Sequence, residues 1–134
     1  MFGYDFKGAV EAVFEYIRVT EFAGRSVSRV GCVYYCRTEK EAAGLARANV
    51  LSEGIHGAEE CSILEVEVED GTVYVYDQSW YDRAWDLLDE SFDAGSVNRV
   101  FSYARRYFEG VMSESPDVEL LSAGKNRVLR VVKD

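Results

Sequence analysis

Two acidic residues near the C-terminus, Asp117 and Glu119, have the spacing that could support chemistry on a sugar. They open the segment Asp117-Val118-Glu119-Leu120-Leu121, whose composition favours a strand. Residues i and i+2 of a strand face the same side, so both carboxylates would share one space. Carboxylates placed in this way orient a sugar hydroxyl and stabilise positive charge at an oxocarbenium-like centre. The same pattern also describes ordinary surface acids of a hairpin, and on spacing alone that interpretation is the commoner one.

Other catalytic or metal-binding patterns are weak in this chain. One His, three Cys and the absence of a Cys-x-x-Cys pair argue against a zinc site, and we expect no bound metal. A Ser-His-Asp arrangement would have to use His56, whose surroundings have a loop composition that favours a surface histidine. Glu65, Glu67 and Glu69 alternate with apolar residues, which fits either a cation site or, as we favour, the solvated face of a strand.

The N-terminal half is expected to alternate helices and strands. Apolar spacing predicts a short helix over residues 5–15, and β-branched and aromatic residues predict a strand over 15–20. The nearly continuous apolar run 30–36 predicts a second strand with both faces covered. Thr38 and Glu41 have the spacing of a capping box, which predicts a helix that ends at Gly54.

The C-terminal half is expected to hold two helices between pairs of strands. Residues 62–69 alternate apolar and acidic side chains, which predicts one buried and one wet face, and Asp70-Gly71 predicts a turn into a strand over 72–76. Apolar stripes predict helices over 80–92 and from a Ser96 cap onward. Two last strands, 118–121 and 128–132, are joined by residues 123–126. The pattern predicts one α+β domain, residues 1–134, with about six strands and three or four helices.

The charge balance of the chain limits its partners. Its 15 Lys and Arg face 24 Asp and Glu, for a net charge of −9. That balance argues against direct binding of nucleic acid or of an anionic membrane surface, and no apolar run is long enough to span a bilayer. Twelve carboxylates fall within residues 59–93 against a single Arg, so an acidic face could imitate nucleic acid and occupy a basic groove. An odd number of thiols, Cys32, Cys36 and Cys61, favours a reducing compartment, and we expect a cytoplasmic protein.

The C-terminal segment resembles the catalytic strand of ADP-ribosyltransferases. In that family a strand begins with an acid-x-Glu or Gln-x-Glu pair, continues through aliphatic residues and a Gly-containing turn, and is followed by a returning apolar strand. Asp117-x-Glu119, then Gly124, then Val128-Leu129-Arg130-Val131 is similar. Residues 16–22 and 31–38 resemble the first and second core strands, and small divergent phage-type members, including those that act against CRISPR complexes, are the most similar.

The resemblance implies roles for five residues. Glu119 matches the glutamate that hydrogen-bonds the nicotinamide ribose of NAD, and Asp117 matches the residue that selects or activates the acceptor. Arg18 matches the arginine that holds the NAD phosphates, a task that suits the parallel donors of a guanidinium. Tyr34 or Tyr35 would lie near the nicotinamide and stack on it. The implied fold is ADP-ribosyltransferase-like, with two small, mostly antiparallel sheets forming a cleft.

Two functions from different classes follow. The first is a mono-ADP-ribosyltransferase that moves ADP-ribose from NAD to a target protein. The resemblance implies that such an enzyme would be a phage-encoded anti-defence effector. An acidic enzyme should prefer a basic target, which fits a nucleic-acid-binding protein. The alternative is a non-catalytic acidic inhibitor or binding module that occupies the basic, nucleic-acid-binding surface of a partner.

Overall fold

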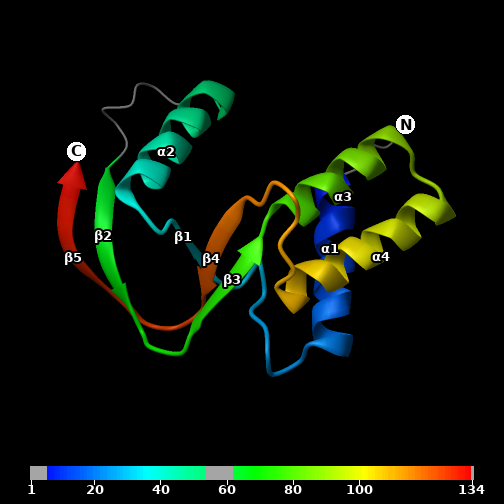
Figure 1. Cartoon of the computed structure of the whole chain (residues 1–134), viewed down its shortest axis with the longest axis horizontal. Helices are drawn as coiled ribbons and strands as arrows, with labels where there is room; N and C mark the ends of the chain where they lie inside the picture. The colour runs from blue at the N-terminus through cyan, green and yellow to red at the C-terminus, as the bar shows by residue number, and fades with distance from the viewer. Residues whose placement is uncertain (1–5, 54–61, 134) are drawn as a thin grey trace.

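The computed structural model of the chain describes residues 6–53 and 62–133. These residues form four helices and five strands in an α+β arrangement (Figure 1). In chain order the elements are α1 Phe6–Glu21, β1 Val33–Tyr35, α2 Glu39–Glu53, β2 Ile63–Val68, β3 Val73–Asp77, α3 Ser79–Glu90, α4 Ala94–Glu109, β4 Val118–Ser122 and β5 Asn126–Lys133. His56, Cys61 and Gly54 lie outside the described residues.

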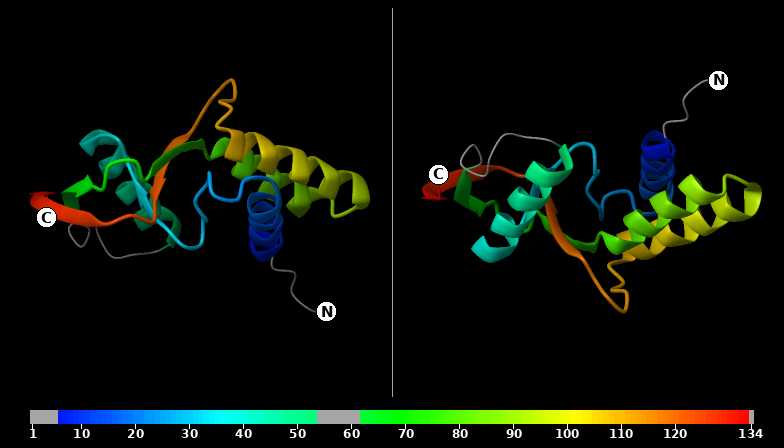
Figure 2. Two further views of the ribbon diagram at one scale, coloured as in Figure 1. Left: turned by 90° about the horizontal axis from the view of Figure 1, so that it is seen from below. Right: turned by 90° about the horizontal axis from the view of Figure 1, so that it is seen from above.

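The strands form two small antiparallel sheets that do not close on each other. One has the order β1-β4-β3 and the other pairs β2 with β5. Helices α1, α3 and α4 gather at one end of the elongated molecule, whereas α2 lies with β2 and β5 at the other (Figures 1 and 2). The α+β class and the helix count predicted from the sequence are therefore confirmed.

The two sheets are joined at a bend. The sequence pattern predicts turns at 70–71 and 123–126, and both turns lie at this bend. β3 pairs with β4 from Val73↔Ser122 to Asp77↔Val118, and β2 pairs with β5 from Val68↔Asn126 onward. Thus Asp70-Gly71 is a turn between two sheets, and β4 and β5 do not pair with each other. The segments 63–77 and 118–133 instead run side by side around one bend (Figure 1).

The bend is held by side chains that bridge the two segments. Thr72 Oγ1 lies 2.7 Å from Ser122 Oγ, and the Gly124 N–H donates to the same Ser122 oxygen at 3.0 Å. A Cβ atom on Gly124 would lie 2.4 Å from Thr72 Oγ1, so only glycine fits there. Gly71 has φ +76°, a left-handed conformation that glycine adopts without strain. Turn residues thus set a bend between sheets rather than a hairpin.

Helix α1 replaces the predicted helix 5–15 and strand 15–20. Val10, Phe14 and Ile17 are fully buried at helical spacing, so the stripe that begins in the first half continues through the β-branched segment. Packing against α3 and α4 outweighs the small helix penalty of Ile17, Val19 and Thr20. The strand prediction for 15–20 is wrong, because burial on one face of a helix decided the conformation there.

The apolar core lies where α1, α3 and α4 pack against β3 and β4. Its buried side chains include Phe14, Tyr81, Leu88, Tyr107 and Leu121. The predicted Ser96 cap is wrong by three residues. Asp93 caps α4 instead, and its Oδ1 accepts the Ser96 N–H at 2.8 Å. Gly110, at φ 78°, ends the helix.

The predicted cap of α2 by Thr38 is confirmed, but two burial predictions are wrong. Thr38 Oγ1 accepts the Glu41 N–H at 3.1 Å. β1 is shorter than the predicted 30–36 strand, and Val33 and Tyr34 are exposed, so its faces are not both covered. Leu64 is exposed as well, although the alternation in β2 predicted a buried apolar face. No helix among residues 6–53 and 62–133 is both long and apolar enough to cross a bilayer.

Candidate functional site

Glu119 is a buried carboxylate on the central strand of the three-stranded sheet. It lies opposite Tyr76 of β3 and is 6% exposed. Its Oε1 accepts from Arg29 Nη1 at 2.5 Å and from Tyr107 Oη at 2.5 Å. Arg29 Nη1 also donates to Tyr107 Oη at 2.8 Å, so the three side chains form a closed triangle. A buried charge is tolerated only when it is paired and hydrogen-bonded, and this triangle meets that requirement.

Arg29 stands at the centre of a group that we call the Arg29 cluster, formed by Glu11, Arg29, Tyr34, Tyr81, Tyr107 and Glu119. Its guanidinium carbon lies 4.0 Å from the Tyr81 ring centre and 5.4 Å from that of Tyr34. Its Nε lies 3.5 Å from Glu11 Oε1. Aromatic faces and two carboxylates therefore surround one cation from three helices and two strands.

The loop between α1 and β1 positions Arg29. Val27 is buried, and Ser28 Oγ donates to Glu15 Oε2 at 3.0 Å, which fixes the loop on α1. The Tyr34 hydroxyl donates to the Arg29 carbonyl oxygen at 2.7 Å, and the Cys32 thiol lies 3.7 Å from the same oxygen. These contacts hold the Arg29 backbone from β1 while its side chain reaches Glu119 on β4.

The electrostatics of the cluster follow from burial. Burial raises the pKa of Glu119, and the Arg29 guanidinium and the Tyr107 hydroxyl oppose that rise. Burial alone would lower the pKa of Arg29, but the Tyr107 and Glu119 oxygens outweigh it and raise the pKa. Burial also raises the pKa of Tyr107, which stays a neutral donor. The cluster is thus a buried ion pair between Arg29 and Glu119, and the neutral Tyr107 hydroxyl is hydrogen-bonded to both partners.

Asp117 is exposed and directly precedes β4, the strand that carries Glu119. Its N–H donates to Asp77 Oδ1 at 2.9 Å, and its carbonyl oxygen accepts the Gln78 N–H at 2.7 Å, which fixes the strand start against α3. The negative charge of Asp117 contributes, after burial, to raising the pKa of Asp82. The predicted acid pair therefore presents one buried and one exposed carboxylate, with Asp82 nearby.

The three predicted cofactor-binding residues, Arg18, Tyr34 and Tyr35, do not lie together in one site. Tyr34 belongs to the Arg29 cluster. Arg18 lies on α1, not on a strand, and its Nε donates to Glu15 Oε1 at 2.9 Å. Tyr35 faces the other side of β1, where its hydroxyl accepts from Asn126 Nδ2 at 2.8 Å. The structure brings Tyr34 and Glu119 to the same arginine, Arg29, and leaves Arg18 and Tyr35 in other contacts.

Sequence reasoning missed Arg29, Glu11 and Tyr81 as neighbours of Glu119. Arg29 stands in a loop of small and apolar residues with no motif around it. Tyr107 was expected only as part of an apolar helical stripe, and it is both core residue and hydrogen-bond donor. The one available signal was a lone arginine in an apolar segment, which must find a buried acid if the segment is buried.

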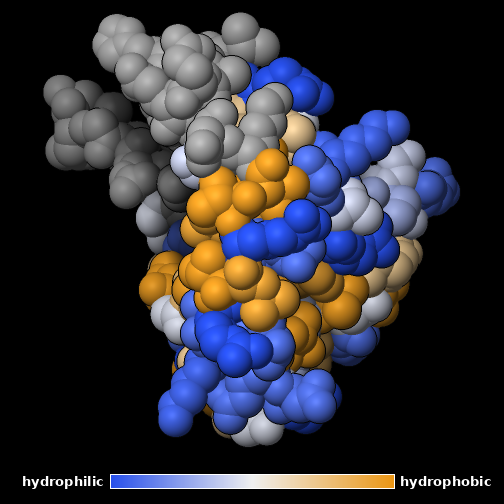
Figure 3. Space-filling model, turned by 90° about the vertical axis from the view of Figure 1, so that its left-hand side faces the viewer, coloured by the Kyte–Doolittle hydropathy of each residue, from blue (hydrophilic) through white to orange (hydrophobic). Residues whose placement is uncertain are grey.

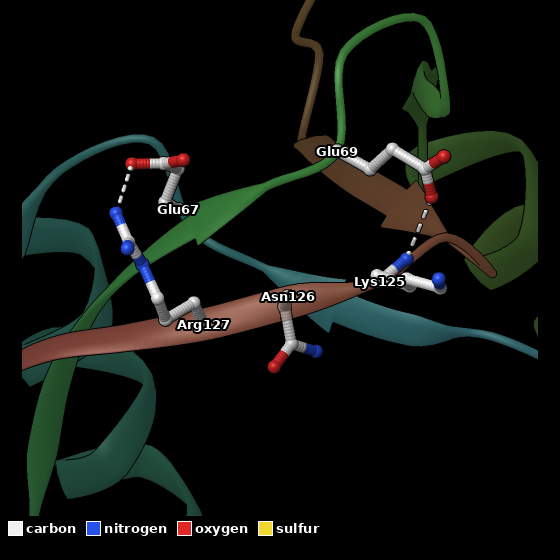
Figure 4. A pocket seen from close by; sticks show the side chains of 5 residues that line it. All are labelled: Glu67, Glu69, Lys125, Asn126 and Arg127. Atoms are coloured by element: carbon white, nitrogen blue, oxygen red, sulfur yellow. Dashed lines mark hydrogen bonds and ion pairs between the residues drawn. The ribbon is translucent and has the colours of Figure 1, made fainter.

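Two open grooves lie at the bend, apart from Glu119. One, of about 300 Å³, is lined by Glu67, Glu69, Lys125, Asn126 and Arg127 (Figure 4). Two of its carboxylates already have donors, since Arg127 Nη2 donates to Glu67 Oε2 at 3.0 Å and the Lys125 backbone N–H donates to Glu69 Oε2 at 3.0 Å. The other, of about 320 Å³, lies between the 26–27 and 71–74 segments and residues 123–124. Neither groove includes a residue of the Arg29 cluster.

The acidic residues of segment 59–93 do not share one face. Among the described ones, Glu65 and Glu67 of β2 form ion pairs with Arg130 and Arg127, and Asp77 is buried. Asp82, Asp86, Asp89 and Glu90 are exposed along α3 at the other end of the molecule. No three His, Cys, Asp or Glu side chains in the described part of the chain are grouped so as to hold a metal ion.

Comparison with known proteins identifies a family. The profile of a family described as "Protein of unknown function (DUF2441)" matches residues 4–134. The chain belongs to the DUF2441 family. No curated protein and no solved structure matches the chain. The DUF2441 assignment covers nearly the whole chain, so the Arg29 cluster and both sheets lie within the family's domain.

Proposed function

We propose that this DUF2441 protein is an NAD-dependent mono-ADP-ribosyltransferase whose reaction centre is the start of β4. The observation that carries the proposal is the contact of the Glu119 carboxylate, two residues after the exposed Asp117, with the Arg29 guanidinium, which in turn lies over the Tyr34 ring. A carboxylate, a cation and an aromatic face are the groups that a charged dinucleotide with a flat ring requires.

The proposed chemistry is a substitution at the ribose carbon that carries nicotinamide. The carbon–nitrogen bond to nicotinamide breaks, and the leaving ring takes the electron pair. Glu119 stabilises the positive charge that develops on the sugar. A nucleophilic atom of the target protein then bonds to the same carbon, and Asp117, exposed at the strand start, takes its proton.

In the proposed reaction the Arg29 side chain must move away from Glu119. Because Glu119 Oε1 already accepts from Arg29 and Tyr107, a ribose hydroxyl can reach that carboxylate only after the Arg29 side chain turns away. The loop that carries Arg29 has no regular secondary structure over residues 22–32, so this change breaks no helix or strand. A guanidinium released from Glu119 stays positive and suits a phosphate group of NAD.

Transfer of labelled ADP-ribose tests the proposal. The purified chain is incubated with adenylate-labelled NAD and an extract of basic proteins. We expect labelled product from the wild type and a loss of about 10²-fold or more in Glu119→Gln, the size expected when a transition-state charge loses its partner. Asp117→Asn should also lose activity, whereas Glu114→Gln, an exposed acid in the preceding loop, should not. Absence of label with the wild type, or equal label with Glu119→Gln, would overturn the proposal.

A second candidate function is an acidic module that binds a basic surface. It is favoured by the exposed carboxylates of α3, where Asp82, Asp86 and Asp89 recur at helical spacing. Such a stripe would bind a basic groove without NAD and with affinity that falls steeply with salt. Replacing the three by Asn should abolish capture of a basic nucleic-acid-binding protein, while Glu119→Gln should leave it unchanged.

A further inference from the structure

The β2–β5 sheet has one apolar face that is exposed to solvent. Leu64 pairs with Val131 and Val66 pairs with Val128, so these four side chains share a face. Leu64, Val128 and Val131 are 48%, 52% and 53% exposed, and Leu129, at a register shift of the ladder, is 47% exposed. At this end of the molecule apolar side chains gather into a patch crossed by polar ones (Figure 3).

The opposite face of the same sheet carries charged side chains that are paired and exposed to solvent. Arg130 lies 3.4 Å from Glu65 and Arg127 lies 3.0 Å from Glu67, and all four side chains are well exposed. Antiparallel sheets with one polar face normally bury the other, and two strands alone are marginally stable. Among the described elements, α2 contacts β2, and Tyr35 of β1 contacts Asn126 of β5. Within residues 6–53 and 62–133, nothing covers Leu64, Val128 and Val131 enough to bury them.

The charge of this part of the chain selects the kind of partner. Residues 63–70 carry four acids and residues 123–133 carry four bases, so the two segments together are neutral, whereas the chain carries −9. A basic partner would find its attraction on α3, at the far end of the molecule. A second copy of the chain meets less like charge at these neutral segments than it would at α3.

We propose that this apolar face packs against the same face of a second copy around a two-fold axis. Two identical two-stranded sheets would then stack at the usual spacing of about 10 Å and form a small sandwich, with Leu64, Val128 and Val131 between them. The arrangement leaves the Glu–Arg pairs of both copies in solvent, where they already lie. Two-fold dimers are the commonest closed assembly, because one self-complementary patch suffices.

Sedimentation equilibrium of wild-type and variant chains tests the proposal. We expect a wild-type mass of twice 15.1 kDa and a single-chain mass for Val131→Asp, which sets a charge in the centre of the packed face. The matched control is Val19→Asp, which puts the same charge on an equally exposed valine of α1 and should stay dimeric. Val131→Thr, nearly the same shape as the wild type, should weaken the dimer by tenfold or more and serves if Val131→Asp does not fold.

Three results would overturn the proposal. One is a single-chain mass for the wild type up to about 100 μM, well above the micromolar constants of weak specific interfaces. Another is a dimer that survives in folded Val131→Asp or is unchanged in Val131→Thr. The third is a dimer that Val19→Asp dissociates, because the contact would then lie on α1.

Discussion

Arg29 and Glu119 bury opposite charges against each other beneath aromatic rings, and a pair of this kind responds asymmetrically to mutation. Arg29→Met removes one partner and leaves a carboxylate in the core, so we expect unfolding free energy to fall by about 3 kcal/mol. Arg29→Met with Glu119→Leu replaces both charges and should regain most of that loss. Urea denaturation of the two variants measures the effect, and a double variant weaker than the single one would contradict it.

Asp77 is a fully buried carboxylate with a structural task. It accepts backbone N–H groups of Ser79, Ser113 and Asp117 at 2.9, 2.7 and 2.9 Å, and so ties the loop after α4 to the start of α3. Burial alone would raise its pKa, but these donors outweigh burial and lower the pKa from 3.8 to about 2. The carboxylate form is therefore the one that the fold stabilises.

The pH dependence of stability should report on Asp77. Because its pKa is lower in the folded chain, the contribution of about 2 kcal/mol is present above pH 4 and is lost as the pH falls toward 2. Asp77→Asn places an NH2 group against backbone donors and should remove that contribution at neutral pH. The gap in melting temperature between wild type and variant should therefore narrow in acid, and a gap that widens would contradict the assignment.

At the scale of elements, local patterns predicted caps and helices well and strand pairing poorly. Thr38 and Glu41 form the expected cap, because capping depends on neighbours in the chain. Residues 15–20 became helical because Ile17 is buried by distant helices, which local propensity does not report. Glu119 was singled out by its motif, whereas its partner Arg29, 90 residues away in the chain, was not. Pairing across such a separation leaves little local trace.

Two glycines should respond oppositely to the same substitution. Gly124→Ala would place a Cβ 2.4 Å from Thr72 Oγ1 at the bend, so the bend must open and stability should fall by about 1 kcal/mol or more. Gly44→Ala lies within α2, where a Cβ meets nothing within 4 Å, and should add about 0.5 to 1 kcal/mol. Thermal unfolding of both variants checks the pair, and equal effects would mean that the bend is not tightly packed.

At the scale of the whole molecule, the net charge should act against self-association. Each copy carries −9, so dimer formation brings like charges closer even though the packed face is neutral. Raising salt to physiological strength, where the Debye length is about 8 Å, should tighten the proposed dimer. Capture of a basic partner by α3 should weaken under the same change. Sedimentation equilibrium at two salt concentrations separates the two forces, and a dimer that salt weakens would contradict an apolar contact.

The shared bend of segments 63–77 and 118–133 has a kinetic consequence. About 40 residues, including α3 and α4, separate Asp77 from Val118, the innermost pair, and docking of that helical hairpin brings the two together. From that pair, strand pairing can proceed residue by residue, first along β3–β4, then across the bend, and finally along β2–β5. Weakening Val66 by truncation to Ala should accordingly speed unfolding while leaving the refolding rate almost unchanged, which stopped-flow chevron plots would resolve. The outermost rungs would be the first to open and the last to form.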